Sequence, residues 1–192
     1  MRVSREKAAQ TRDRIVEKAG TLFRAKGFGG VGVADVMKAA DLTHGGFYGH
    51  FDSKEDLSVE ASRQALAAGA ARWRSIVAEA GDKPYPALLE YYVSSRHRDD
   101  PARGCALSAL GADAARGSAG LRRAFGDGLQ AFLDILTDAL PGFSKPAKRR
   151  KAVAAMATMV GAVTLARAVD DPVLSDEILE AVRQELRTAA YR

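Results

Sequence analysis

Glycine and proline residues divide this chain into about nine segments, and the apolar residues of these segments recur with the period of an α-helix. No segment alternates convincingly with the two-residue period that a half-buried β-strand requires. One apolar stripe is clearer than the others and comprises Leu121, Phe125, Leu129, Phe132, Leu136 and Leu140. The pattern predicts an all-α fold.

The same punctuation predicts where the longer helices begin and end. We expect helices over residues 4–26, 84–98, 103–116, 118–140, 145–169 and 173–191, and a long helix that follows Asp52-Ser53 and reaches Ala80. The uncharged run from Ala152 to Ala166 is shorter than the about 20 apolar residues that cross a bilayer. We therefore interpret it as a buried helix.

Residues 32–54 predict two short helices joined by a tight turn, with a third helix directly after them. The apolar side chains of this segment share one face: Val33, Val36, Met37, Ala40, Leu42, Phe47 and Phe51. Thr43 stands where the second helix begins, so its hydroxyl can accept a backbone N–H there. The opposite face of the second helix, Thr43 to His50, is free to enter a DNA groove. This arrangement is a helix-turn-helix.

The segment and the helix before it resemble the N-terminal domain of the TetR (tetracycline-repressor) family of bacterial regulators over roughly residues 10–60. The positions that carry the resemblance are Thr11-Arg12, Ile15, Ala19, Leu22, Phe23, Gly27-Phe28, Val36, Ala39-Ala40, Thr43, Gly45, Phe47-Tyr48, His50-Phe51 and Ser53-Lys54. Two positions depart from the family pattern. Asp41 replaces the usual turn glycine, and Gly46 replaces a Thr or Ser. Asp tolerates the left-handed backbone of such a turn at a cost of about 1 kcal/mol.

The resemblance implies a set of DNA-binding residues, namely Thr43, His44, Gly45, Gly46, Tyr48, His50, Lys54 and Arg5. His44 is the side chain best placed to read bases, and Thr43 is the next. Tyr48, His50 and Lys54 are expected at the phosphate backbone, which positions a protein without reading sequence. Arg2, Arg5 and Lys7 form a basic arm that either enters a minor groove or remains a solvated terminus.

Charge separates the N-terminal quarter from the rest of the chain. Residues 1–54 contain ten Lys and Arg against six Asp and Glu, whereas residues 55–192 contain nineteen against eighteen. We therefore assign residues 1–54 to a DNA-binding domain and residues 55–192 to a helical effector-binding and dimerisation domain. The single cysteine excludes an intramolecular disulfide, and no leader pattern precedes the first helix. Both observations favour a cytoplasmic location.

The second domain offers candidates for an effector pocket and for a dimer interface. Candidate pocket residues are Trp73, Tyr92, His97, Cys105, Phe125 and Met156, although aromatic and methionine residues at helical spacing are more often simple core. The last two helices resemble those with which family members dimerise, and the candidate interface residues are Val160, Leu165, Leu179, Val182 and Leu186.

Cys105 follows Arg103-Gly104 at the start of an expected helix, where unpaired N–H groups and the arginine can lower a thiol pKa. Some relatives in the family carry a Gly-Cys at a comparable place, and in some regulators such a thiol senses oxidants or electrophiles. The alternative is a small buried hydrophobic residue.

Neither catalysis nor metal binding finds support in the sequence, since no His, Cys or Glu set has the spacing of metal ligands and no convergent acid–base set stands out. No cofactor is expected. We therefore predict a homodimeric, ligand-responsive transcriptional repressor that binds a palindromic operator in double-stranded DNA and leaves it when a small-molecule effector binds. The alternatives are a small-molecule enzyme that uses the helical cavity and a ligand-free architectural DNA-binding protein.

Overall fold

A computed structural model describes residues 5–142 and 144–190 of the chain. Arg2 of the expected basic arm and the expected helix end at Tyr191 lie outside the described residues. Within them the chain is all-α, as predicted, and no strand is present. The elements are α1 (Arg5–Lys26), α2 (Val33–Ala39), the 3-10 helix η1 (His44–Gly49), α3 (Lys54–Glu79), α4 (Pro84–Tyr92), α5 (Ser95–Asp99), α6 (Ala106–Arg116), α7 (Ala119–Ala139), α8 (Lys145–Ala168) and α9 (Pro172–Ala189).

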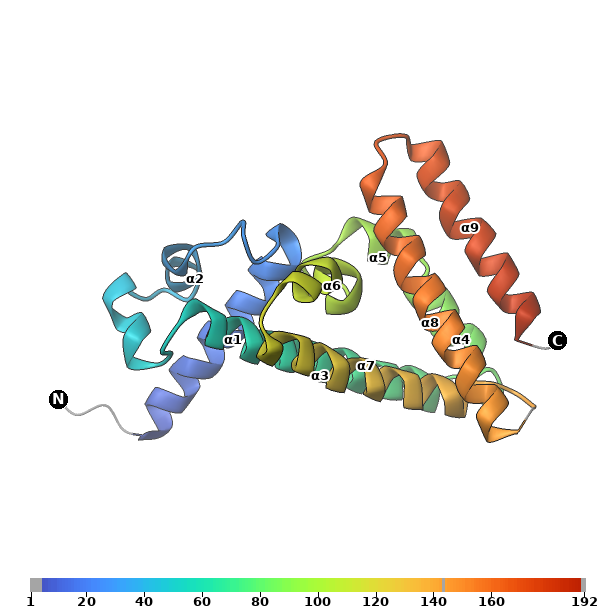
Figure 1. The fold of residues 1–192 in the computed structure, drawn as a ribbon, viewed down its shortest axis with the longest axis horizontal. Helices are drawn as coiled ribbons and strands as arrows, with labels where there is room; N and C mark the ends of the chain where they lie inside the picture. Colours follow the sequence, from blue (N-terminus) through green and yellow to red (C-terminus); the bar gives the residue numbers. More distant parts are fainter. Residues whose placement is uncertain (1–4, 143, 191–192) are drawn as a thin grey trace.

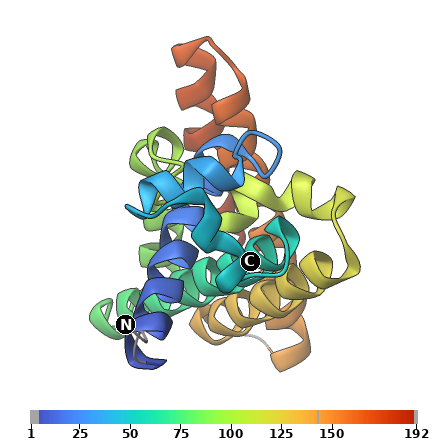
Figure 2. The same ribbon diagram turned by 90° about the vertical axis from the view of Figure 1, so that its left-hand side faces the viewer.

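The helices form two ends joined by a long middle section (Figure 1). At one end α1, α2 and η1, which we call the N-terminal unit, pack around the start of α3, and Figure 2 looks onto this end. The helices α3 and α7 run side by side through the middle, and α8 and α9 form an antiparallel pair at the other end. One apolar core runs from Ile15 in α1 to Ala190 after α9. The helix α3 therefore connects the two ends without a break.

The expected helix over residues 84–98 is in fact two helices. The first ends at Tyr92, and Val93 leaves the helical conformation with ψ 73°. Ser94 then starts α5, because its hydroxyl accepts the backbone N–H of His97 at 3.2 Å. The next helix likewise starts at Ala106 rather than at residue 103. Residues 100–105 consequently form a connecting loop in the middle of the molecule.

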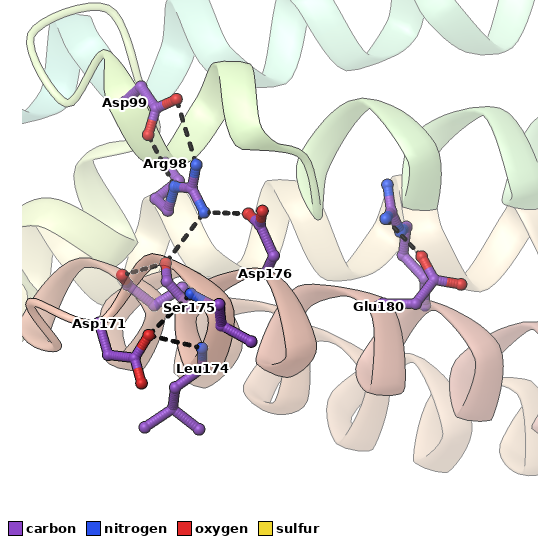
Figure 3. Close-up of polar contacts among 10 residues, drawn as sticks. Arg98, Asp99, Asp171, Leu174, Ser175, Asp176 and Glu180 are labelled. Atoms are coloured by element: carbon purple, nitrogen blue, oxygen red, sulfur yellow. Dashed lines mark hydrogen bonds and ion pairs between the residues drawn. The ribbon is translucent and has the colours of Figure 1, made fainter.

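Polar contacts fix α5 against α9 (Figure 3). The guanidinium of Arg98 donates to the Ser175 hydroxyl at 2.9 Å and to the Asp176 carboxylate at 2.5 Å. Asp171 caps α9 by accepting the backbone N–H groups of Val173 and Leu174. The start of α9 is thus held by a side chain of α5.

The helix α8 is the one helix among the described residues that is long and apolar enough to cross a membrane by length and composition alone, and core helices of soluble proteins pass the same test. We expected a buried helix, but only one face of α8 is buried, against α5, α6, α7 and α9. Val153 and Leu165 remain 47% and 58% exposed. The outward face is therefore apolar and open.

Two of the expected dimer-interface residues are wrong, because they lie inside the subunit. Leu179 and Leu186 are only 2% and 8% exposed, since α9 packs this face against α4 and α8. The Leu186 carbonyl also accepts the buried hydroxyl of Tyr85 at 3.2 Å. Val160 and Val182 are half-buried, whereas Leu165 is exposed. The apolar side chains that α9 leaves exposed or half-buried include Leu174, Ile178, Ala181 and Val182.

Candidate nucleic-acid interface and helical-domain cavity

The turn between α2 and η1 has the backbone that the sequence predicts. Asp41 has φ 56°, which makes it the single non-glycine residue with positive φ among residues 5–142 and 144–190. At the start of α2 the Asp35 carboxylate accepts the backbone N–H of Gly32 at 2.8 Å. Both ends of α2 are therefore set by local contacts, and the chain leaves the turn in a fixed direction.

The expected recognition helix is a 3-10 helix rather than an α-helix. It contains three glycines, Gly45, Gly46 and Gly49, and each costs an α-helix roughly 1 kcal/mol relative to alanine. The expectation for Thr43 is also wrong in one respect, because Thr43 occupies the N-cap but its hydroxyl caps no backbone N–H. Burial holds the element in place instead. Phe47 is 0% exposed and stacks on Phe51 with the ring centroids 5.6 Å apart.

The opposite face of η1 is open to solvent. Thr43, His44, Gly45 and Gly46 are exposed, and Tyr48 is 69% exposed although its ring packs edge-on against Phe47. His50, which follows η1, is half-buried, and Arg5 is exposed at the start of α1. The structure thus brings five of the expected DNA-binding residues onto one exposed surface. An element that is held by buried apolar side chains and exposes a polar face is suited to entering a DNA groove.

Two cations support this surface from behind. Arg12 of α1 donates from Nε to the His50 carbonyl at 3.4 Å, forms a two-pronged ion pair with Glu60 of α3, and lies over the Phe51 ring at 4.5 Å. The Lys54 ammonium donates to the Phe28 carbonyl at 2.6 Å. Lys54 is therefore tied to the loop after α1 as well as being a candidate phosphate contact. Sequence reasoning missed the role of Arg12 in positioning η1.

A cavity of about 910 Å³ lies between α1, α3, α4, α5 and the 100–105 loop, and Phe132 of α7 reaches it. Of the expected pocket residues, Trp73, Tyr92, His97 and Cys105 line this cavity. Phe125 and Met156 are buried but do not line it. Sequence reasoning missed the contribution of α1, which comes from Glu17, Gly20, Thr21 and Arg24. Their three- and four-residue spacing, on a face other than that of Ile15 and Ala19, is the signal that marks them.

Hydrogen bonds at both ring nitrogens hold His97 in one neutral tautomer. Nε2 accepts the backbone N–H of Cys105 at 2.9 Å, so the proton is on Nδ1, which donates to the Tyr92 carbonyl at 2.7 Å. Burial lowers the pKa of His97 to about 4, and the nearby Arg167 guanidinium also lowers it. His97 therefore fixes the cavity wall and does not act as a cation.

Cys105 does not have the lowered pKa that its position in the sequence suggests. Burial raises the pKa of the thiol, even though the nearby Tyr92 hydroxyl, the first turn of α6 and the Arg167 guanidinium lower it in part. Arg103 is 88% exposed on its side chain and pairs with Asp100 instead. The Tyr92 hydroxyl, which is next to Cys105 and Ser108, meets no partner with good hydrogen-bond geometry in the described structure. On the side of the cavity beside α6, the cationic group next to these residues is the Arg167 guanidinium, which donates to the Ser108 hydroxyl at 3.3 Å.

Comparison with known proteins gives three kinds of match. The family model of bacterial regulatory proteins of the tetR family matches residues 15–61, which contain α2, η1 and the start of α3. The HTH-type transcriptional repressor NemR of Escherichia coli K12 is 27% identical over 134 residues, or 68% of this chain and 67% of that protein. The crystal structure of E. coli NemR in its reduced form has a TM-score of 0.77 at 22% identity, covering 93% and 96% of the two chains.

The chain belongs to the TetR family. A TetR-family regulator from Cytophaga hutchinsonii has the same fold, with a TM-score of 0.77 at 23% identity over 98% of both chains. The transcriptional repressor KstR2 of Rhodococcus jostii is 35% identical over 86 residues, which are 45% of this chain and 41% of KstR2. As a TetR-family member, this protein is a DNA-binding transcriptional regulator, and the exposed face of η1 is its helix-turn-helix surface.

Proposed function

We propose that this TetR-family regulator is a homodimeric repressor that leaves a palindromic operator when a small molecule occupies its cavity. The observation that carries the proposal is the position of the cavity, which is lined both by α1 of the N-terminal unit and by helices of the second domain. A ligand there contacts both parts of the molecule at once. The names of the relatives NemR and KstR2 as transcriptional repressors support the repressor assignment.

In this proposal residues 1–54 bind DNA and residues 55–192 bind effector and partner subunit. Thr43 and His44 read base edges, while Tyr48, His50, Lys54 and Arg5 contact phosphates and the glycines let the backbone approach. Ligand-dependent movement of α3 changes the separation of the two recognition elements in the dimer, so effector and operator weaken each other's binding by the same factor. A cytoplasmic location is part of the same proposal.

The dimer that we propose uses the outward faces of α8 and α9. On α8 this face is formed by Val153, Ala157, Gly161 and Leu165, and on α9 by Leu174, Ile178 and Val182. Small residues on α8 allow a second helix to approach closely, and a two-fold axis places the same patch of each subunit in one four-helix contact. Two subunits then present two recognition elements to successive major grooves.

We also propose that the cavity binds its ligand without transforming it. The family consists of transcriptional regulators. The single histidine of the cavity, His97, uses both ring nitrogens within the protein. Among the described residues no group of three or more His, Cys, Asp and Glu side chains is arranged to hold a metal ion.

Selection of bound sequences from random duplex DNA tests the proposal. We expect a two-fold symmetric motif, bound by a dimer, and a metabolite screen by thermal shift is then repeated with and without this operator. An effector should raise the melting temperature of the free protein, and this rise should be smaller when operator is present, because effector and operator weaken each other's binding. An asymmetric motif bound by a monomer, or ligands that leave operator affinity unchanged, would contradict the proposal.

A further inference from the structure

Arg24 is a cationic side chain of the N-terminal unit that reaches the cavity of the second domain. Its Nε donates to the carbonyl of Ala102, in the 100–105 loop, at 2.8 Å. Among the described residues no carboxylate lies within salt-bridge distance of its guanidinium. Arg24 is half-buried, and this burial lowers its pKa although Asp100 and Cys105 act in the opposite direction. A desolvated arginine without an ion pair favours an anion from outside the chain.

The carboxylates around the cavity do not serve as the anionic partner of Arg24. Glu90 is bound by Arg187 and Arg183 of α9, and Asp100 accepts the backbone N–H of Arg103 at 3.2 Å. Glu17 is exposed at the rim. The cations at the wall are more numerous than the carboxylates and comprise Arg24, Arg72, Arg96 and Arg103. The wall therefore carries one more cation than it carries carboxylates, and Arg24 is the half-buried member of the four.

The remaining wall determines the body of the ligand. The Trp73 ring meets the rings of Tyr92 and Phe132 edge-on, with centroids 5.6 and 4.9 Å apart, and Ala61, Ala65 and Ala68 of α3 leave space beside them. This floor is apolar. It suits a hydrocarbon or a single ring, and the anion of such a molecule must lie towards the arginines.

We propose that the cavity binds organic carboxylates whose anionic group is held by the two terminal nitrogens of Arg24 and whose apolar body lies against Trp73. The proposal rests on the proposed function, because it names the ligand class of that same cavity. Nε of Arg24 keeps its bond to Ala102, so a bound carboxylate, Arg24 and the 100–105 loop form one connected unit. Ligand binding thereby acts directly on α1, which carries the N-terminal unit, as well as on α3.

Trp73 is the single tryptophan of the chain, so its fluorescence reports binding to the full-length protein without any DNA. The probes are two matched pairs: phenylbutyrate with phenylbutyramide, and octanoate with octanamide. We expect each carboxylate to bind at least 10-fold more tightly than its amide. Arg24→Gln should remove this preference while leaving amide binding unchanged, and Arg24→Lys should keep a part of it because the charge remains.

Arg14→Gln is the matched control, since it removes the same charge from an exposed position of α1 outside the cavity. It should retain the full preference for carboxylates. The proposal is overturned if carboxylate and amide bind equally, if neither carboxylate binds, or if Arg24→Gln keeps the preference while its circular dichroism shows a folded protein. A different experiment, the operator selection, decides the proposed function. That function would still stand if neutral molecules, rather than carboxylates, bound the cavity and released DNA.

Discussion

His44 and Lys54 lie on the same exposed end of the molecule but have different surroundings. His44 is exposed on η1 with no fixed partner, whereas the Lys54 ammonium is half-buried and already donates to the Phe28 carbonyl. A free side chain on the recognition element reads base edges, and a cation held at its rim contacts phosphate. The two substitutions should therefore have different consequences for DNA binding.

We expect His44→Ala to lower the ratio of operator to random-DNA affinity by about 10-fold, the value of one good base contact. Lys54→Ala should weaken both affinities about equally and reduce the slope of log affinity against log salt by about 1. Fluorescence anisotropy titrations on both DNAs at several salt concentrations measure these quantities. An unchanged specificity ratio in His44→Ala would show that another side chain reads the bases.

His97 makes stability depend on pH in a defined window. Its pKa is about 4 in the folded protein and about 6.5 in the unfolded chain, so the unfolded state binds more protons between these values. The free energy of unfolding should thus fall as pH drops from about 6.5 to 4, by roughly 3 kcal/mol at most. Urea unfolding at a series of pH values measures it. A His97→Gln variant whose pH profile matched that of the wild type in this window would refute the assignment.

Cys105 should be slow to react in the folded regulator. Because burial raises the pKa of its thiol, only a small fraction is thiolate at neutral pH. We expect reaction with Ellman's reagent to be at least about 10-fold slower in the native protein than in urea, and Cys105→Ser to bind operator as the wild type does. Equal rates in both conditions would indicate an accessible, activated thiol and restore the hypothesis of a redox sensor.

At the scale of elements, η1 is held by burial of Phe47 rather than by helix propensity, and its glycines remain available to DNA. A Cβ added at Gly45 meets no atom within 4 Å, and the φ of Gly45 is not positive. The added methyl therefore costs the folded protein nothing, yet it occupies the space that a DNA backbone must enter. A substitution at Gly45 should therefore change stability and DNA affinity in opposite directions.

Gly45→Ala should raise the free energy of unfolding by up to about 1 kcal/mol and weaken operator binding. Gly126→Ala, in the middle of α7, is the matched control because its Cβ also meets no atom within 4 Å. It should raise stability similarly with no effect on DNA. Thermal unfolding and anisotropy titration test both variants, and full operator affinity in Gly45→Ala would place the DNA backbone elsewhere.

For the whole molecule, the two faces of the α8–α9 pair predict opposite effects of the same substitution. Leu165→Asp places a carboxylate on the exposed outward face, so it should yield a folded monomer with much weaker operator binding. Leu186→Asp buries a carboxylate within the subunit and should destabilise folding by more than about 3 kcal/mol. Sedimentation and circular dichroism separate the two outcomes. A dimeric Leu165→Asp variant would exclude this face from the interface.

The sequence by itself determined the features that arise from local interactions. Three features follow from spacing within residues 32–56: the left-handed turn residue Asp41, the cap of α3 by Ser53, and the apolar seam through Phe47 and Phe51. These features depend on backbone chemistry and side-chain spacing between residues that are close in the sequence. That is why the helix-turn-helix and the all-α class could be predicted and the family resemblance identified.

Only the tertiary structure decided which face of each helix is covered and by what. Leu179 and Leu186 lie inside because α4 occupies that side of α9, and Leu165 lies outside because no helix of the same subunit covers it. The thiol of Cys105 is desolvated and Arg24 reaches the cavity because α1 and the 100–105 loop meet across 78 positions of sequence. The periodicity of a sequence indicates that a helix has an apolar face. The burial and the pKa of each side chain depend on the neighbours that the fold places around it.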